Sequence, residues 1–228
     1  MAAESTRPII VCPLEFERQQ LERTGLTEHC DVQCSGPGSD RMARWVRTAD
    51  PDGRIVILAG LAGSLHADRP AGTAWLISRV ARPAPKRAFT PTFEPRSEKA
   101  PDTEIISTDL TVGRPIARRQ LQLASGATLV DLESERFASA ARNRGWTWAI
   151  VRGVSDDFST VLPDEIDTWV DDAGRTRFST VMRSLLCKPT LLPVVLELRR
   201  NSTAAMEAVD RLIRTIMSID DAIGEPAP

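Results

Sequence analysis

The chain has 228 residues, 42% hydrophobic and 26% charged, which is the composition of a folded globular protein rather than a disordered one. Its 29 basic and 31 acidic side chains give a net charge of -2, so no overall positive field attracts nucleic acid. No apolar run approaches the roughly 18 residues that a membrane-spanning helix needs, and residues 1–8 lack the apolar core of a secretion signal. We therefore expect a cytoplasmic protein that has no integral membrane segment and does not bind nucleic acid.

Short β-branched apolar runs alternate with helical patterns along most of the chain. Strands are expected at residues 8–12, 31–35, 54–58, 73–80, 104–108, 128–131 and 147–152. Helices are expected at residues 15–23, 39–47, 115–125 and 134–144. The proline-rich residues 82–102 predict a loop, and residues 191–217 predict helix with a break near Asn201 and Ser202. This alternation favours one α/β domain over residues 1–228, built on a mostly parallel central sheet.

Cysteine and histidine are too few for extensive metal chemistry. His29, Cys30 and Cys34 form the only local cluster, and no second pair completes the four ligands of a zinc site. Cys12 and Cys187 lie in apolar runs and are expected to be small core residues. We therefore expect no metal site.

Glycines or carboxylates follow several expected strands, where open α/β sheets bind their ligands. The segments are residues 13–17, 60–64, 130–135 and 151–157. Each one alone has an ordinary interpretation. The glycines at 60 and 63 suit a tight strand-to-helix turn, and they complete neither a Walker loop nor a dinucleotide fingerprint. The glutamates at 15, 17, 133 and 135 suit helix starts, and Ser155 with Asp156 suits a helix cap.

Together the segments resemble the nucleoside phosphorylase and nucleosidase superfamily, especially its methylthioadenosine/S-adenosylhomocysteine nucleosidase-like branch. The strongest stretch is residues 130–156, which carries an acidic-Leu-Glu helix start and ends in Arg152-Gly-Val-Ser-Asp156. Gly60-Leu-Ala-Gly-Ser-Leu65 is similar to the family's Gly-x-Ala-Gly-Gly-Leu segment, and Ser35-Gly-Pro-Gly38 to its early Thr-Gly-x-Gly turn. Gly72 matches the glycine of a following Gly-Asp, with Thr73 in place of the aspartate. The resemblance is strongest over residues 8–160.

The resemblance implies a single-domain, three-layer α/β/α fold with a mixed central sheet. It implies cleavage of the N-glycosidic bond of a purine nucleoside of the adenosine type, with or without a 5′ substituent. This chemistry requires no metal or organic cofactor. Family members form homodimers or higher homo-oligomers, so a homo-oligomer is expected. Leu162-Pro-Asp164 and residues 189–200 resemble the hopanoid-associated phosphorylase branch, whose substrate is an adenosyl-bearing lipid precursor.

The family's catalytic roles transfer to five residues. Asp156 matches the acid that protonates the departing purine at N7, and Ser155 and Arg152 would orient it. Glu133 corresponds to the carboxylate that holds the ribose hydroxyls. Glu17 corresponds to the residue that positions and activates water.

Further contacts with substrate follow from the same resemblance. The backbone N–H of Gly63 would bind the water or a phosphate, and Leu132 would pack on the sugar, where the family commonly has methionine. Thr111 and Val112 lie in the stretch that borders the base. Leu61 stands where the nucleosidases commonly carry a hydroxyl, which changes the contact with the nucleophile.

The nucleophile is expected to be water, because Glu17 would repel a phosphate dianion. The alternative is a phosphorylase that makes ribose 1-phosphate, with Arg18 and Arg69 available as phosphate ligands. A second alternative, motivated by Leu61 and Thr73, is a non-catalytic nucleoside-binding module.

The apolar residues after the helix break in the last third have two interpretations, core or subunit interface on one hand and pocket lining on the other, and the first is favoured. They are Leu191, Leu192, Val194, Val195 and Leu198, within a C-terminal helical segment at residues 190–218. Trp146 and Trp148 are expected to be packing residues.

Overall fold

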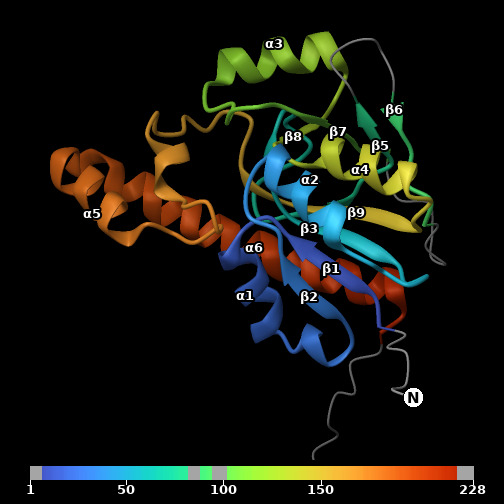
Figure 1. The fold of residues 1–228 in the computed structure, drawn as a ribbon. Helices are drawn as coiled ribbons and strands as arrows, with labels where there is room; N and C mark the ends of the chain where they lie inside the picture. Colours follow the sequence, from blue (N-terminus) through green and yellow to red (C-terminus); the bar gives the residue numbers. More distant parts are fainter. Residues whose placement is uncertain (1–6, 82–87, 94–101, 220–228) are drawn as a thin grey trace, which may run out of the picture.

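The computed structural model describes residues 7–81, 88–93 and 102–219, and these form a nine-stranded mixed sheet with helices on both faces (Figure 1). The strands are β1 (Ile9–Cys12), β2 (Asp31–Cys34), β3 (Val56–Ser64), β4 (Ala74–Leu76), β5 (Arg79–Ala81), β6 (Ala88–Phe89), β7 (Glu104–Ser107), β8 (Leu129–Asp131) and β9 (Trp148–Asp156). The helices are α1 (Glu15–Arg23), η1 (Leu26–Glu28), α2 (Ser39–Thr48), α3 (Pro115–Ser125), α4 (Ser134–Asn143), η2 (Ile166–Trp169), α5 (Phe178–Cys187), η3 (Pro189–Leu191) and α6 (Leu192–Met217).

Strand β3 lies at the centre of the sheet and pairs with three other strands. Its first half lies between β1 and β9, parallel to both, and β2 extends the sheet beyond β1. Its last residues pair antiparallel with β8, from which β7, β5 and β6 continue. Strand β9 also pairs antiparallel with β4. The mixed sheet agrees with the expected fold class.

Alternation along the central strands explains the three layers. In β9 the side chains of Trp148, Ile150 and Val154 pack in the core under α2 and α4, whereas Ala149 and Val151 face the core under α1 and α6. Successive residues of a strand point to opposite faces, so a strand buried on both faces is apolar at nearly every position. The two tryptophans at 146 and 148 are packing residues, as expected.

Two of the ordinary interpretations and one expectation from the sequence are wrong, because tertiary contacts extend an element. The glycines at 60 and 63 make no turn, since β3 continues through them with a register shift between Ala62 and Gly63. Ser155 and Asp156 cap no helix, because β9 pairs with β3 as far as Asp156. Helix α6 runs unbroken through residues 201 and 202, where packing against β9, β4 and β3 outweighs local propensity.

The C-terminal helices and residues 73–102 also differ from expectation. Cys12 is buried as predicted, but Cys187 is exposed, because α5 buries none of its residues. The five apolar residues at 191–198 are half-buried or exposed and do not form core. The single strand expected at 73–80 is two short strands, β4 and β5. Strand β6 lies within the expected loop at 82–102, of which residues 82–87 and 94–101 lie outside the described residues.

Across the described residues, no helix combines the length and apolar character needed to cross a membrane.

Candidate active site

A buried arginine in the middle of β9 organises the first group of polar side chains. Arg152 is fully buried on the sheet face that otherwise carries Trp148 and Ile150, and it lies opposite Gly60 of β3. Its Nη2 donates to Asp131 and lies 3.5 Å from Oε2 of Glu133. Burial alone would lower the pKa of Arg152, but the neighbouring carboxylates outweigh it and raise that pKa. The guanidinium is therefore a fixed positive charge inside the protein.

Glu17 reaches this arginine from the first turn of α1. It is 2% exposed, and its Oε1 accepts the backbone N–H of Leu61 at 2.7 Å. Its Oε2 accepts the N–H of Leu14, also at 2.7 Å, which caps the start of α1. Burial raises the pKa of Glu17 to about 8, and the opposing effects of Arg152 and the two N–H groups are smaller. The helix-start interpretation of Glu17 is correct, and the side chain is in addition buried beside Arg152.

Gly60 makes this approach possible. A Cβ at position 60 would lie 2.7 Å from Nη1 of Arg152 and 2.7 Å from Oε1 of Glu17, closer than carbon tolerates. The space left by the absent side chain of Gly60 is thus where the side chains of Glu17 and Arg152 approach each other.

Glu133 joins the group from the start of α4. It is 5% exposed, and its Oε1 accepts the N–H of Gly38 at 2.7 Å, so the glycine turn at residues 35–38 does contact the site. Burial raises the pKa of Glu133, repulsion from Asp131 adds to the shift, and Arg152 opposes it. Asp131 itself is held by the hydroxyl of Ser107 and by the N–H and hydroxyl of Ser134. Asp131 therefore fixes both the start of α4 and the arginine.

A second group lies at the end of β9. Asp156 is 5% exposed, and it accepts a hydrogen bond from the hydroxyl of Ser155 and forms an ion pair with Arg118. Arg118, on α3, is 1% exposed and also donates to the backbone oxygens of Val112 at 2.8 Å and Asp157 at 2.5 Å. Arg118 thus ties α3 to the end of β9 and, through the backbone oxygen of Ser64 at 3.4 Å, to the end of β3.

The two groups lie along one strand pair. Arg152 and Asp156 are four residues apart on β9, about 13 Å in an extended strand. On β3, Gly60 adjoins Glu17, and a Cβ on Gly63 would lie 3.1 Å from Oδ2 of Asp156. An elongated ligand lying along β3 and β9 would meet carboxylates at both of its ends.

The remaining predicted residues flank these groups. Leu132 is half-buried between Asp131 and Glu133. Leu61 lies in a strand rather than a loop, and its side chain packs in the core on the α6 side, so only its backbone meets Glu17. Thr111 donates to Asp167 of η2.

Both candidate phosphate ligands are engaged elsewhere. Arg18 forms ion pairs with Glu15 and Glu22 on the surface of α1. Arg69 stacks on Trp75, with 3.9 Å from its guanidinium carbon to the ring centroid. Among the described residues, no cluster of three histidine, cysteine or acidic side chains is arranged to hold a metal ion.

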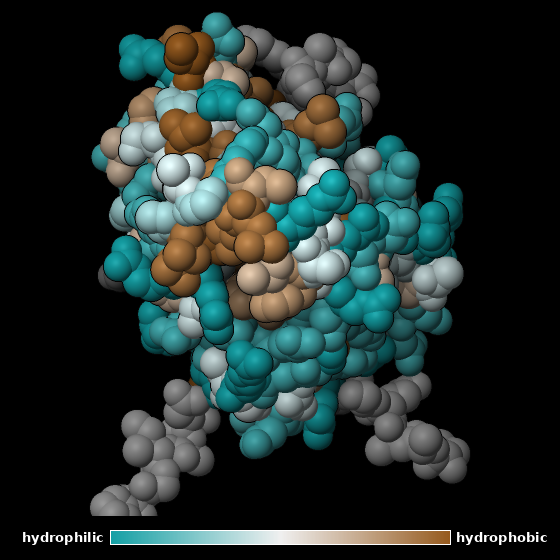
Figure 2. All heavy atoms as spheres, turned by 90° about the vertical axis from the view of Figure 1, so that its left-hand side faces the viewer, coloured by the Kyte–Doolittle hydropathy of each residue, from teal (hydrophilic) through white to brown (hydrophobic). Residues whose placement is uncertain are grey.

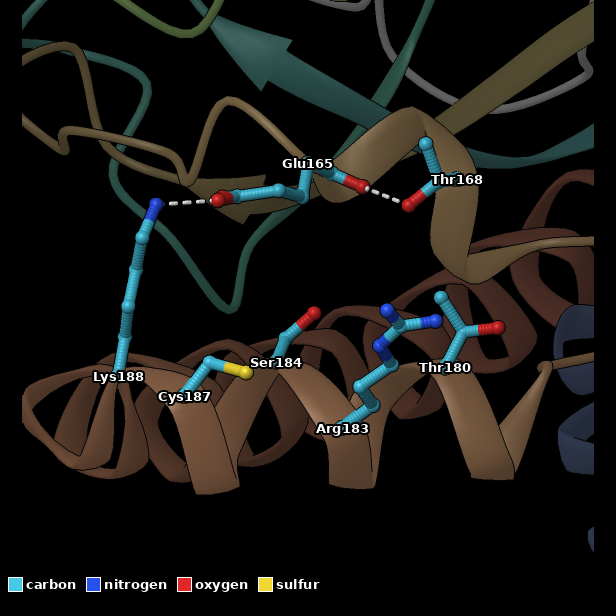
Figure 3. Close-up of a pocket in the computed structure, with 7 residues that line it drawn as sticks. All are labelled: Glu165, Thr168, Thr180, Arg183, Ser184, Cys187 and Lys188. Atoms are coloured by element: carbon cyan, nitrogen blue, oxygen red, sulfur yellow. Dashed lines mark hydrogen bonds and ion pairs between the residues drawn. The ribbon is translucent and has the colours of Figure 1, made fainter.

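The carboxylates are enclosed. The loop at residues 170–176 covers the two segments whose backbone N–H groups donate to Glu17 and Glu133. Within this loop, the backbone oxygen of Gly174 accepts the N–H of Glu15 at 2.9 Å, and Asp172 forms an ion pair with Arg41 at 2.9 Å. A surface cavity of about 300 Å³ lies elsewhere, between η2 and α5 (Figure 3), and shares no residue with the carboxylate groups.

Sequence reasoning missed Arg118 and gave Asp131 no role. Arg118 and Arg119 are adjacent in a helix, and nothing in the local pattern marks the first as buried and the second as exposed. Asp131 had a usable signal: an acidic residue three positions before Ser134, at a strand end, is typical of a side chain that caps the following helix.

The fit around Gly60 yields a stability prediction. Gly60→Ala is expected to lower the free energy of unfolding by about 1–3 kcal/mol, because the methyl overpacks the space between Glu17 and Arg152. Urea unfolding measures the change. Gly53→Ala is the matched control, since a Cβ there meets nothing within 4 Å and costs only backbone strain. Equal losses for the two variants would contradict the close approach at Gly60.

The layers and sheet topology are those of the nucleoside phosphorylase/nucleosidase fold, and they confirm the fold that the sequence resemblance implied. A methylthioadenosine/S-adenosylhomocysteine nucleosidase from Colwellia psychrerythraea 34H, solved with adenine, is similar with a TM-score of 0.65 and 15% identity, covering 96% of this chain and 97% of that chain. An S-adenosylhomocysteine nucleosidase from Streptococcus pyogenes gives a TM-score of 0.63 at 14% identity, covering 96% and 100% of the two chains.

A futalosine hydrolase from Helicobacter pylori strain 26695 gives a TM-score of 0.62 at 12% identity, covering 95% of this chain and 99% of that one. No protein-family model matches the sequence, and no curated protein matches it significantly. At these identities the likeness establishes the fold.

Proposed function

We propose that this chain cleaves the N-glycosidic bond of a purine nucleoside of the adenosine type, with water as the nucleophile. The observation that carries the proposal is the row of three buried carboxylates, Glu17, Glu133 and Asp156, along β3 and β9. Buried carboxylates are costly to a fold, so three along one strand pair mark a functional site. They occupy the positions at which the sequence resemblance expects the acid, the ribose ligand and the water-positioning residue.

Asp156 delivers the proton that the leaving base requires: its carboxylate, paired with Arg118 in the free protein, takes up a proton from solvent and passes it to the base. Breaking the glycosidic bond leaves negative charge on the purine, and protonation at N7 neutralises it. Ser155 and Arg118 hold the carboxyl group from two sides, so its orientation is set before substrate binds. Arg118 also places positive charge near the departing base.

Glu133 and Glu17 act on the sugar side. An acceptor carboxylate at Glu133 binds the ribose hydroxyls and stabilises the positive charge that develops on the ring. Glu17 accepts a proton from water, and its raised pKa near 8 suits a general base at neutral pH. Arg152 forms an ion pair with Glu133 at 3.5 Å, and its positive charge acts on Glu17 nearby.

The raised pKa of Glu17 predicts the pH dependence of the reaction. The base acts only when ionised, so kcat/KM should rise about tenfold per pH unit up to about pH 8 and then level off. Initial rates from about pH 6 to about pH 9 test this. Glu15→Gln, which changes a half-buried carboxylate on the same helix, should keep the profile, and Glu17→Gln should lose the activity that rises with pH. A flat profile for the unaltered protein would remove Glu17 from the role of base.

Phosphorolysis is the second candidate, and one observation favours it. Nε and Nη1 of Arg152 are buried and have no hydrogen-bond partner among the described residues, so they offer donors to an anion. Against it, Glu17 adjoins Nη1, and its ionised form would repel a phosphate dianion. A non-catalytic nucleoside-binding module is the third candidate, but it has no use for an acid placed at the leaving base.

Product analysis by chromatography separates these candidates. Adenosine, inosine, methylthioadenosine and S-adenosylhomocysteine are each incubated with the protein, with and without phosphate. Free base and free sugar in phosphate-free buffer support hydrolysis. Strict phosphate dependence with ribose 1-phosphate as product supports phosphorolysis and contradicts the role of Glu17. Nucleoside binding without turnover supports the binding module.

A further inference from the structure

A helical segment that precedes the buried turns of α6 projects from the body of the protein. We call residues 175–200 the arm; it comprises α5, η3 and the first turns of α6 (Figure 1). Helix α5 buries no residue, and the buried positions of α6 begin only at Ala205. The arm therefore contributes little to the core.

The arm concentrates exposed apolar side chains. Of the nine large hydrophobic residues that are exposed in the described part of the chain, five lie in it: Phe178, Met182, Leu186, Leu192 and Leu196. The first three are spaced four residues apart and share one face of α5, and the last two share a face of α6. Figure 2 views the side from which the arm projects and shows an apolar patch near its centre, flanked by hydrophilic side chains. Packing within the monomer does not account for this patch.

The arm is also strongly basic. It contains six basic residues and one acidic residue, a net charge of +5, so the remaining residues of this chain carry -7. All six basic side chains are exposed: Arg175, Arg177, Arg183, Lys188, Arg199 and Arg200. Arg175 pairs with Asp171 and Lys188 with Glu165, and the other four form no ion pair within the described part of the chain. Arg183 lines the gap beneath η2 (Figure 3), so Arg177, Arg199 and Arg200 are the charges that face solvent most freely.

We propose that the arm docks on the surface of an anionic phospholipid bilayer. Exposed leucine, methionine and phenylalanine beside arginine are the composition of an interfacial helix, whose apolar face enters the headgroup boundary while its cations meet phosphates. The charge disfavours an arm-to-arm contact between two copies, because two arms of +5 repel each other. An arm that docks on the body of a second copy, which carries -7, is an outcome that the test below separates from membrane binding. The five exposed apolar side chains also favour a bilayer over nucleic acid, because contacts with nucleic-acid phosphates would leave these side chains exposed to water.

Vesicle co-sedimentation tests the proposal. The full chain should sediment with vesicles of equimolar phosphatidylglycerol and phosphatidylcholine, and should stay in the supernatant with phosphatidylcholine alone or at high salt. Arg177→Glu with Arg199→Glu should weaken binding about tenfold or more, since each basic side chain near an anionic surface contributes about fivefold. Phe178→Ser with Leu186→Ser should weaken binding by a similar factor.

The controls lie on α3, outside the arm. Leu123 is 73% exposed, like Phe178, so Leu123→Ser removes an equally exposed apolar side chain, and Arg119→Glu reverses an exposed charge. Both should bind as the unaltered chain does. No binding to anionic vesicles, equal loss in the α3 controls, or a dimer in light scattering that Phe178→Ser with Leu186→Ser converts to monomer would each overturn the proposal. Binding to duplex DNA that the two serine changes leave intact would overturn it too.

Discussion

Asp156→Asn is expected to lower kcat by about 10²- to 10⁴-fold, because asparagine keeps the shape of the side chain but has no acidic proton to give to the departing base. Nucleoside binding should change far less than kcat, since the proposed contact with the sugar is made by Glu133. The measurement is steady-state kinetics on the nucleoside that the product assay identifies, together with calorimetric titration of the same nucleoside on the variant.

The neighbouring residue provides a matched control. Asp157→Asn makes the same chemical change one position away, on a side chain whose carboxylate accepts the N–H of Ala71 at 2.6 Å and does not face the carboxylate row. It should retain kcat within a small factor. Thermal melting of both variants separates a chemical defect from unfolding. An Asp156→Asn protein that melts normally and turns over at an unchanged rate would exclude Asp156 as the acid.

The sequence predicts the central elements because their patterns are locally determined. Residues 9–12 and 148–151 are apolar at every position and therefore indicate strands buried on both faces. Glu17 and Glu133 stand out in the sequence because each follows an expected strand, where ligand crevices form, but their roles follow only from the family resemblance and stay predictions. Helix α1 has the bounds expected from its sequence, since Pro13 precedes it and polar residues continue it as far as Arg23.

What the sequence could not predict depends on contacts between distant segments. The glycines of β3 read locally as a turn, yet they stay in the strand because β9 pairs alongside, and because Gly60 must leave room for two charged side chains. The pairing of Arg118 with Asp156 joins residues 38 positions apart. No periodicity or spacing in α3 indicates it.

Arg118→Met is expected to lower the free energy of unfolding by about 3–5 kcal/mol, because it leaves the buried carboxylate of Asp156 without its charged partner. The cost should exceed that of an ordinary core change, since Arg118 also satisfies backbone oxygens of Val112 and Asp157. Urea unfolding gives the value. Arg119→Met removes the exposed arginine beside it and should stay within about 0.5 kcal/mol of the unaltered protein.

The double variant distinguishes the ion pair from simple packing. If the loss in Arg118→Met comes from an unpaired buried charge, adding Asp156→Asn removes that charge and should recover part of the stability, so the two changes are not additive. Additive losses would mean that Arg118 stabilises the fold through its aliphatic stem and backbone contacts alone.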